Sequence, residues 1–426
     1  MNQPASQPST DRVWTLADAQ DWLLSLEIFG MTFGLERVRR LMTALGSPQE
    51  RLRAVHVVGS NGKSSTVRMI AAILRRHGLR SGAYLSPHLV SFNERLRVDG
   101  CDVDEAQFAQ AVRRAARAAA AVNRTLPDGE NVTQFEALTA AAYSELDRRE
   151  VDVAVIEAGL GGRFDATNVL RSEVAVLTNV SLEHTRWLGP TIADIAREKV
   201  DVVRERSTLV IGPDLHPDAL AVAQEVCAQR DVRLITTSFD GVPTIPGAAP
   251  YQRRNLAVAR AAAQALLGEL DDAALAVAAA ETSVPGRFET ISREPLTILD
   301  GAHNADGARH LAEALEGVAD GRPIVFCLSI LEDKDAATML REIAPLSTGL
   351  VLTAASTPRA LSPGTLASLA RQVGWDGEPQ VVPEPHAALA AARAAAGPGG
   401  IVVVAGSLYL LADLLRPAGS GRGSVL

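Results

Sequence analysis

Several kinds of residue are scarce in this sequence, and each shortage excludes a class of protein. The chain has three cysteines, Cys101, Cys227 and Cys327, which stand far apart without a CxxC or Cys/His spacing. That arrangement predicts neither a zinc site nor a disulfide framework, and it indicates a reducing compartment. No apolar run reaches the roughly 18 residues of a membrane helix, and the first residues, MNQPASQPSTDR, are polar. We therefore expect a cytoplasmic protein with no membrane partner.

Positive charge is also limited. The formal net charge is −8 at pH 7, and the isoelectric point is about 5.6. A protein that binds nucleic acid through its phosphates carries a basic footprint, which this composition does not provide. We expect no nucleic-acid partner, so any small anionic ligand must be held by local groups.

Lysine is especially scarce: Lys63, Lys199 and Lys334 are the only three, whereas lysine and arginine together number 42. Arginine can replace lysine on a solvated surface, but it cannot act as a compact ammonium beside a phosphate or as a reactive amine. Each lysine is therefore a candidate functional residue, with codon bias and chance as the alternative explanation.

The composition is otherwise that of an ordinary globular protein. Hydrophobic residues make up 47% of the chain and charged residues 22%, which is typical of soluble domains. A length of 426 residues exceeds the size at which one hydrophobic core usually stops growing, so two domains are expected.

Short β-branched runs alternate with helical patterns along the chain. Near-continuous apolar runs of this kind are typical of strands buried on both faces of a parallel sheet. They occupy residues 54–58, 151–159, 173–180, 207–212, 295–300, 322–329, 349–356 and 400–407. Ala-rich helical patterns at 111–122, 257–280 and 387–396 are read as packed helices.

A change of composition at SVPGRFE (283–289) divides the alternation into two parts. We predict an α/β protein with two domains. Residues 1–284 would form a P-loop-type, mostly parallel sheet with flanking helices. Residues 285–426 would form a smaller Rossmann-like α/β domain.

The segment GSNGKSS (59–65) stands between a predicted strand and a predicted helix. Its glycines let backbone N–H groups approach phosphates, the helix N-terminus adds positive potential, and Lys63 can reach the terminal phosphates. Ser64 or Ser65 can bind Mg²⁺. The spacing is shorter than GxxxxGK[ST], since Val57 stands where the first glycine would be. The segment predicts a nucleotide site unlike that of generic P-loop ATPases, with an ordinary glycine-rich turn as the alternative.

This loop resembles the GTNGK loop of the Mur ligase superfamily, and further segments resemble its folylpolyglutamate synthase/dihydrofolate synthase branch. The similarity runs in order from about residue 20 to residue 412, and such colinearity is more specific than one motif. The segments are FGLERV (33–38), LSPHLVSFNER (85–95), VTQFEALT (132–139), IEAGLGGRFDATN (156–168), LEHTRWLG (182–189), REK (197–199), YQRRNLAVA (251–259), PGRFE (285–289), LDGAHNADG (299–307), LEDKD (331–335), STPRAL (356–361) and AGSLYL (405–410). Ser60 and Asp201 depart from the family pattern, which has threonine and glycine there.

The resemblance implies an ATP- and Mg²⁺-dependent ligase that joins L-glutamate to a folate-type carboxylate, either dihydropteroate or a reduced folate. An acyl phosphate and ADP would form first, and the glutamate amine would then displace phosphate. Residues 1–284 would be the ATP-binding domain, and residues 285–426 would be the glutamate-ligase domain. We expect a monomer whose partners are these small molecules. Two other functions stay open: a Mur-type ligase of a cell-wall precursor, and a P-loop NTPase switch. A dinucleotide-dependent oxidoreductase is disfavoured, since no GxGxxG follows a strand.

The same resemblance implies the residues of the site. The catalytic residues would be Lys63, Lys199, His184 and Arg287. The nucleotide would be bound by Gly59, Ser60, Asn61, Gly62, Lys63, Ser64, Ser65, Asn255, Arg287 and Asp300. The metal ligands would be Ser65, Ser86, Glu157, His184 and Lys199. The folate-type substrate would contact Met31, Thr32, Phe33, Thr133, Gln134, Phe135, Glu136, Phe164, Asp165 and Ala166. Glutamate would contact His303 and Ser407.

Some of these residues also have a structural explanation. In the family, the lysine at the position of Lys199 is carbamylated, whereas a solvated lysine is the alternative. Asp300 and Ser407 can instead cap the helices that follow their strands. Lys334 has no chemical role that the sequence defines, and a salt bridge in a surface loop is the alternative.

Overall fold

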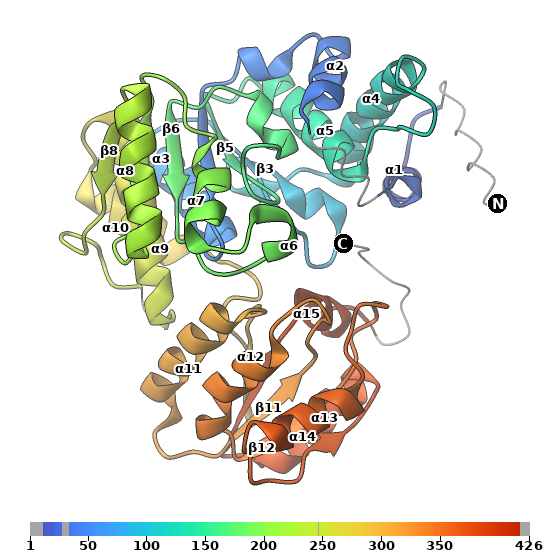
Figure 1. Cartoon of the computed structure of the whole chain (residues 1–426), viewed down its shortest axis with the longest axis vertical. Helices are drawn as coiled ribbons and strands as arrows, with labels where there is room; N and C mark the ends of the chain where they lie inside the picture. The colour runs from blue at the N-terminus through green and yellow to red at the C-terminus, as the bar shows by residue number, and fades with distance from the viewer. Residues whose placement is uncertain (1–11, 28–33, 246, 418–426) are drawn as a thin grey trace.

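The chain forms two lobes, each built around one sheet (Figure 1). The structure is a computed structural model that describes residues 12–27, 34–245 and 247–417. The predicted substrate residues Met31, Thr32 and Phe33 lie outside these described residues. Among the described residues, no helix combines the length and the apolar character needed to span a membrane.

The first sheet has eight strands in the order β4-β3-β2-β5-β1-β6-β7-β8. Strand β1 pairs in parallel with β5 and β6, whereas β3 and β4 form an antiparallel edge beside β2. The strands are β1 (Ala54–Val58), β2 (Ser81–Tyr84), β3 (Leu96–Val98), β4 (Cys101–Asp102), β5 (Val153–Glu157), β6 (Val174–Leu177), β7 (Thr208–Ile211) and β8 (Arg233–Thr236). From β1 the chain turns to β2 on one side and later reaches β6 on the other. The loop after β1 therefore opens where the strand order reverses, the usual ligand position in such sheets.

Helices cover both faces of the first sheet because its central strands are apolar on both faces. Ala54 of β1 packs in the core with α4 and α5, while Val55 and Val57 pack with α3, α9 and α10. The helices of this lobe are α1 (Leu16–Ser25), α2 (Glu36–Ala44), α3 (Lys63–Arg76), α4 (Glu105–Asn123), α5 (Gln134–Arg148), α6 (Thr185–Leu188), α7 (Ile192–Val200), α8 (Pro217–Arg230), α9 (Pro250–Leu267) and α10 (Asp272–Glu281). Short 3₁₀ helices are η1 (Pro48–Glu50), η2 (Phe92–Arg95) and η3 (Ala166–Val169).

The second sheet has six strands in the order β13-β12-β11-β14-β10-β9, all parallel except β9. The strands are β9 (Glu289–Arg293), β10 (Leu296–Leu299), β11 (Ile324–Leu328), β12 (Gly349–Leu352), β13 (Gln380–Val381) and β14 (Ile401–Ala405). The helices are α11 (Ala305–Ala319), α12 (Ala336–Ile343), α13 (Pro363–Gln372), α14 (Pro385–Ala396) and α15 (Leu408–Leu414), with η4 (Ala344–Leu346). Helices α11, α12 and α13 pack on one face, and α14 and α15 pack on the other.

The predicted fold class is confirmed, with a strand inside every predicted apolar run. The predicted Ala-rich stretch 257–280 is not one helix, because α9 ends before Gly268, which has φ +86°, and α10 begins at Asp272. The segment 282–288 connects the two lobes, and the position of the boundary within it stays a prediction.

Candidate functional site

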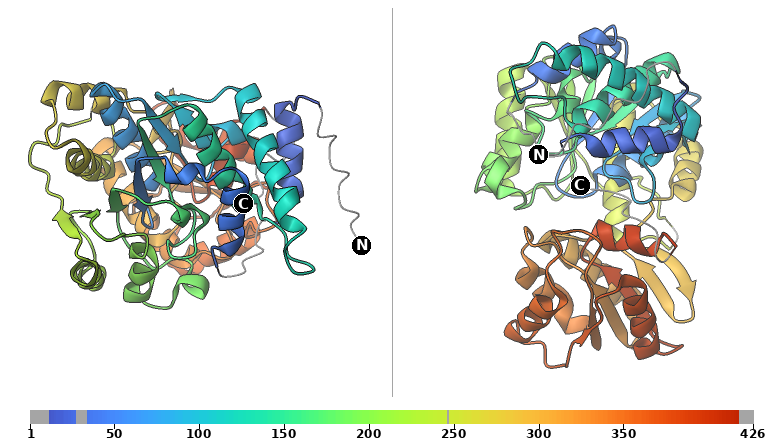
Figure 2. Two further views of the ribbon diagram at one scale, coloured as in Figure 1. Left: turned by 90° about the horizontal axis from the view of Figure 1, so that it is seen from above. Right: turned by 90° about the vertical axis from the view of Figure 1, so that its right-hand side faces the viewer.

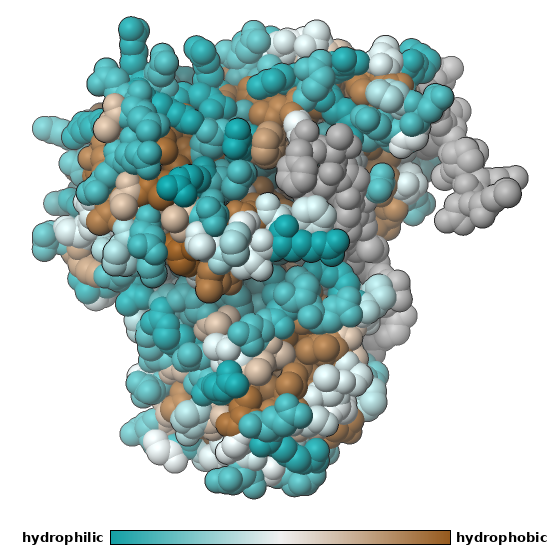
Figure 3. All heavy atoms as spheres, viewed as in Figure 1, coloured by the Kyte–Doolittle hydropathy of each residue, from teal (hydrophilic) through white to brown (hydrophobic). Residues whose placement is uncertain are grey.

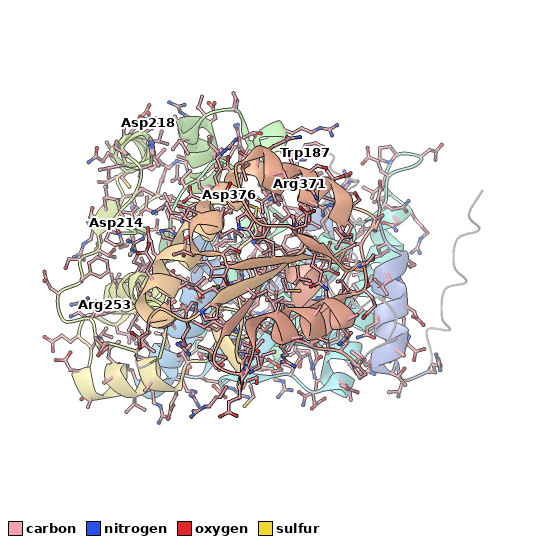
Figure 4. All side chains as sticks on the ribbon, turned by 90° about the horizontal axis from the view of Figure 1, so that it is seen from below. Trp187, Asp214, Asp218, Arg253, Arg371 and Asp376 are labelled. Atoms are coloured by element: carbon pink, nitrogen blue, oxygen red, sulfur yellow. The ribbon has the colours of Figure 1, made fainter. Side chains whose placement is uncertain are left out.

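A cavity of about 1060 Å³ lies between the two lobes. Its walls come from the loops after β1, β5 and β6 of the first sheet and after β10, β11 and β14 of the second. The carboxyl ends of both sheets therefore face one space, and the outline of the molecule narrows at this junction (Figure 3). Helix α15 lies at the same junction (Figure 2). Asp214 and Trp187, which both line the cavity, stand well apart on the first lobe (Figure 4).

The glycine loop requires its glycines. Gly59 has φ +150° and Gly62 has φ +81°. An added Cβ would lie 1.9 Å from Thr178 Oγ1 at the first position and 2.3 Å from Asn255 Oδ1 at the second. Helix α3 begins directly after Gly62, so its N-terminal amides and helix dipole face the cavity, an arrangement suited to phosphate.

Two lysines meet at this loop. Lys63 Nζ donates to the carbonyl oxygens of Gly59 (3.0 Å) and Ser60 (3.2 Å). Lys199 Nζ, on helix α7, donates to the same Gly59 oxygen (2.9 Å) and to Glu183 Oε1 (3.0 Å). The Lys199 side chain is 2% exposed, and this burial lowers its pKa. Burial alone would raise the pKa of Glu183, but the charges of Lys199 and Lys63 outweigh it and hold that pKa below its ordinary value.

Glu157 ends strand β5 and is buried beside the glycine loop. Its Oε1 accepts from Ser64 Oγ (2.9 Å) and its Oε2 accepts from the Ser86 amide (3.2 Å). Burial raises the pKa of this carboxyl, against the charge of Lys63. The Ser65 hydroxyl is buried and has no hydrogen-bond partner. A buried carboxylate and an unpartnered hydroxyl are hard oxygen donors, and they fit Mg²⁺.

Few of the predicted metal ligands are acidic side chains. Within the residues that the structure describes, no cluster of three or more His, Cys, Asp or Glu side chains could hold a metal. Of the predicted ligands, Ser65, Ser86, Glu157, His184 and Lys199 all line the cavity. Glu157 is their only carboxylate, so a metal here needs additional oxygens from a nucleotide, from water or from a modified Lys199.

The connecting segment contributes Arg287, which lies over the backbone of Gly301 in the second lobe. A Cβ at Gly301 would stand 1.8 Å from Arg287 Nη1. Asp300, at the end of β10, accepts from the hydroxyl of Tyr251 (2.6 Å) and from the amides of Phe288 (2.9 Å) and Ala302 (2.8 Å). Asp300 therefore ties the connecting segment to helix α9, and Asn304, not Asp300, caps α11.

Ser407 and His303 also line the cavity from the second lobe. Ser407 Oγ accepts from the Tyr409 amide (3.1 Å), so it caps α15 while it lines the cavity. The His303 Nδ1 lies 2.8 Å from the Gly301 carbonyl oxygen, which can only accept, so Nδ1 carries the proton and Nε2 keeps a lone pair. Burial and the charge of Lys334 lower the pKa of His303 to about 4. Burial and the same charge lower the pKa of His184 to about 4, so both imidazoles are neutral at pH 7.

The described residues of the predicted folate-type wall line one part of the cavity, but several are already engaged. These residues are Thr133, Gln134, Phe135, Glu136, Phe164, Asp165 and Ala166. Arg37 Nε donates one bifurcated hydrogen bond to the two carboxylate oxygens of Glu136 (3.0 Å each). Glu136 also accepts from Thr133, with which it forms a capping box. Gln134 Nε2 donates to the Leu23 carbonyl oxygen (2.9 Å).

Asp165 has a different environment. Its buried carboxylate accepts from the amides of Leu160 (2.8 Å) and Thr167 (3.0 Å) and from the Thr167 hydroxyl. Burial raises its pKa, and the hydrogen bonds oppose that rise. An added Cβ at Gly159 would lie 2.6 Å from the Phe135 ring, so ring and carboxylate stand close together around this turn.

The cavity brings together every predicted residue that the structure describes except Gly59, whose carbonyl oxygen binds the two lysines instead. Sequence reasoning assigned no role to many of the other lining residues, among them Lys334 and Arg95. Lys334 is 9% exposed and lines the cavity, and it also forms an ion pair with Asp333 (3.6 Å), so the salt bridge given as the alternative is present as well. The scarcity of lysine in the sequence had marked Lys334 as a candidate functional residue. Arg95 is fully buried, and its Nε contacts His88 Nδ1 (2.8 Å). Arg95 lies within the segment LSPHLVSFNER (85–95), but its burial cannot be predicted from the sequence.

Comparison with known proteins identifies the same family over most of the chain. Residues 57–249 match the Mur ligase middle domain, and residues 286–408 match the Mur ligase, glutamate ligase domain. The chain is 34% identical over 423 residues to a probable bifunctional folylpolyglutamate synthase/dihydropteroate synthase of Haloferax volcanii. That match covers 93% of this chain and 50% of the relative, so the chain spans half of that longer protein. It is 30% identical over 431 residues to the dihydrofolate synthase/folylpolyglutamate synthase of Bacillus subtilis, covering 94% of this chain and 98% of the relative.

Solved structures are similar over almost the same length. A Mycobacterium tuberculosis folylpolyglutamate synthase complexed with ADP superposes with a TM-score of 0.89 at 29% identity, covering 96% of this chain and 99% of that one. A bifunctional folylpolyglutamate synthase/dihydrofolate synthase with Mn, AMPPNP and L-glutamate bound gives a TM-score of 0.83 at 29% identity, with coverage of 96% and 99%.

Proposed function

The chain belongs to the dihydrofolate synthase/folylpolyglutamate synthase family of Mur ligases, and on that premise we propose that it joins L-glutamate to a folate-type carboxylate at the expense of ATP. The acceptor is dihydropteroate, a reduced folate, or both, and the products include ADP and phosphate. One observation carries the proposal: the glycine loop with Lys63 and the residues His303 and Ser407 line one and the same cavity. The loop suits a triphosphate, and the second-lobe residues suit an amino acid.

The first lobe holds and activates the phosphates. The amides at the start of α3 and the Lys63 ammonium offset negative charge on the terminal phosphates. Lys63 must first leave the Gly59 and Ser60 oxygens, which it can do because its flexible stem follows the loop. Asn255 stands against Gly62, and Arg287 approaches from the connecting segment. Transfer of the γ-phosphoryl group to the acceptor carboxylate makes an acyl phosphate with a good leaving group.

A divalent metal, for which we propose Mg²⁺, would be held by Glu157, Ser65, Ser86 and His184 with Lys199. Its chemistry would be to neutralise charge on the phosphate oxygens. Burial lowers the pKa of Lys199 and so favours the neutral amine that reacts with carbon dioxide, while the ion pair with Glu183 opposes this shift and would have to open for carbamylation. The carbamate would convert the cation into the second anionic oxygen ligand that the set otherwise lacks.

The second lobe positions the incoming amino acid. His303 presents the unprotonated Nε2 and Ser407 its hydroxyl, while the nearly buried Lys334 supplies a positive charge for a carboxylate of glutamate. On the folate-type side, Asp165 offers a carboxylate to N–H groups of a flat heterocycle, beside the rings of Phe135 and Phe164. The closed space between the lobes limits hydrolysis of the acyl phosphate by water.

Three further features belong to the proposal. The domain boundary lies at residues 284/285, inside the connecting segment, where a change of a few dihedral angles would move the lobes relative to each other. The enzyme acts as a monomer, since each lobe of one chain contributes to the cavity. It acts in the cytoplasm, a reducing compartment that suits its three free cysteines.

A substrate panel tests the proposal. Purified protein receives ATP and Mg²⁺ with dihydropteroate or tetrahydrofolate, with and without glutamate, and both ADP formation and product mass are measured. ADP release that requires both acceptor and glutamate, with a product heavier by one glutamyl unit, is the expected result. ATP hydrolysis without glutamate would indicate a switch, and AMP as the product would contradict the acyl-phosphate route. Lys63→Ala should abolish ADP formation, whereas Arg233→Ala on the exposed strand β8 serves as the matched control.

A further inference from the structure

The glycine loop is held from both lobes, not from the first alone. On its own side, the Asn61 amide donates to Asn179 Oδ1 (2.7 Å), and Thr178 Oγ1 donates to the Asn61 carbonyl oxygen (2.7 Å). From the second lobe, Asn304 Nδ2 donates to Asn61 Oδ1 (3.0 Å). Asn61 Nδ2 donates in return to Asn304 Oδ1 (3.3 Å) and to Asp306 Oδ2 (3.1 Å). Asn61 is therefore fixed between the end of β6 and the start of α11.

The orientation of these amides follows from the helix cap. Asn304 caps α11, and its Oδ1 accepts from the Gly307 amide (2.8 Å). The Asn304 Nδ2 must therefore point to Asn61 and can only donate. Asn61 must then present Oδ1 to that donor, which leaves its Nδ2 for the carboxylate of Asp306. Each polar atom has one consistent role, so the contact specifies a single relative position of the two chain segments.

Asp306 is itself fixed. Its Oδ1 accepts from Arg309 Nη2 (2.5 Å), and its Oδ2 also accepts from Asn179 Nδ2 (3.2 Å), a second contact with the first lobe. The residue lies in the first turn of α11, where the helix dipole stabilises a negative charge. In Figure 1, α11 stands on the side of the lower lobe toward α9.

We propose that Asn304 and Asp306 are positioning residues that act through Asn61 and Asn179. They hold the glycine loop in its phosphate-binding shape, and they align the second lobe with it, so that nucleotide affinity depends on contacts made by the other lobe. Separation of the lobes would break these hydrogen bonds together, which couples closure to nucleotide binding. The inference rests on the proposed role of the loop as the nucleotide site.

The chain offers variants that separate this role from helix stability. Asn304→Ser keeps a good capping residue at the start of α11 but removes the amide that reaches Asn61. Asp306→Ala removes the carboxylate, and Asp306→Asn keeps one oxygen acceptor in the same place. Glu384→Ser is the matched control, because Glu384 caps α14 in the same lobe and lies outside the residues that line the cavity.

Affinity for AMPPNP with Mg²⁺ is measured by calorimetry, together with Tm and the radius of gyration in solution without nucleotide. We expect Asn304→Ser and Asp306→Ala to weaken AMPPNP binding about tenfold, the effect of losing one to two net hydrogen bonds. Both should raise the radius of gyration. Asp306→Asn should recover part of the affinity, and Glu384→Ser should bind as the unchanged protein does.

The effects of Asn179→Ala and Asp306→Ala should also be less than additive, because the two residues share a bond. Unchanged affinity in Asn304→Ser and Asp306→Ala, in a protein that still ligates glutamate, would overturn the inference and leave the proposed function intact. Failure of the unchanged protein to bind AMPPNP would instead overturn the role of the loop itself. Additive effects of Asn179→Ala and Asp306→Ala would contradict the proposed pathway through the shared bond.

Discussion

Replacement of Gly62 by alanine tests whether the shape of the glycine loop depends on this residue. Gly62 has φ +81°, and a Cβ there would lie 2.3 Å from Asn255 Oδ1. The left-handed backbone alone costs an alanine about 1 kcal/mol. The contact with Asn255 adds about 1–3 kcal/mol, since one of the two must move. Gly62→Ala should therefore lose about 2–4 kcal/mol of stability and should also bind AMPPNP more weakly.

Gly78 provides the matched control at the other end of the same helix. It has φ +83°, but a Cβ there would meet nothing within 4 Å. Gly78→Ala should lose only the backbone contribution of about 1 kcal/mol, a shift in Tm of about 2 °C, with unchanged nucleotide affinity. Urea unfolding and calorimetry with AMPPNP measure both effects. If Gly62→Ala were no less stable than Gly78→Ala and bound AMPPNP normally, the steric argument for this loop would be wrong.

Three other predictions concern the proposed chemistry. The free energy of unfolding should fall as the pH drops from 6.5 toward about 4, because the unfolded chain takes up a proton at His303 that the folded chain, with a pKa of about 4, does not. His303→Gln should make the free energy of unfolding depend less steeply on pH. Lys199→Arg keeps the positive charge of an unmodified lysine but cannot be carbamylated, so the rate of ligation should fall strongly and labelled bicarbonate should give no carbamate signal. A Lys199→Arg variant that still ligates glutamate would argue against the modification. Chelation of divalent metal should abolish ADP formation, and added Mg²⁺ should restore it. The Glu157→Gln variant should need a higher Mg²⁺ concentration than the unchanged protein. If both proteins needed the same Mg²⁺ concentration, Glu157 would not be a metal ligand.

The central strands could be predicted from the sequence because burial on both faces leaves nearly continuous apolar runs. Strands β1, β5 and β6 lie inside such runs, and the loops after them contain the predicted residues. The antiparallel edge could not be predicted in the same way. Strand β4, with only Cys101 and Asp102, is exposed, so its sequence has no apolar pattern. β13 is equally short and exposed.

Within the site, sequence motifs placed residues in the cavity but could not show which polar groups were already engaged. Glu136 is bound by Arg37, and Gln134 by Leu23, and these partners lie about one hundred residues earlier in the chain. The pairing of Lys199 with Glu183 likewise depends on the packing of α7 against the loop after β6. The rarity of lysine was the only sequence signal for Lys334, because the local sequence does not show that its side chain is 9% exposed.

The two walls of the cavity belong to separately built sheets, and this has a consequence for how specificity can change. The proposed contacts for the heterocycle come from the first sheet, whereas His303, Ser407 and Lys334 come from the second. The two lobes have separate hydrophobic cores, so substitutions that keep the Asn61–Asn304 contact between the lobes need no repacking in the core of the other lobe. Acceptor preference and amino-acid preference can therefore be varied independently, and a hybrid that combines the first lobe of one relative with the second lobe of another should inherit one preference from each parent.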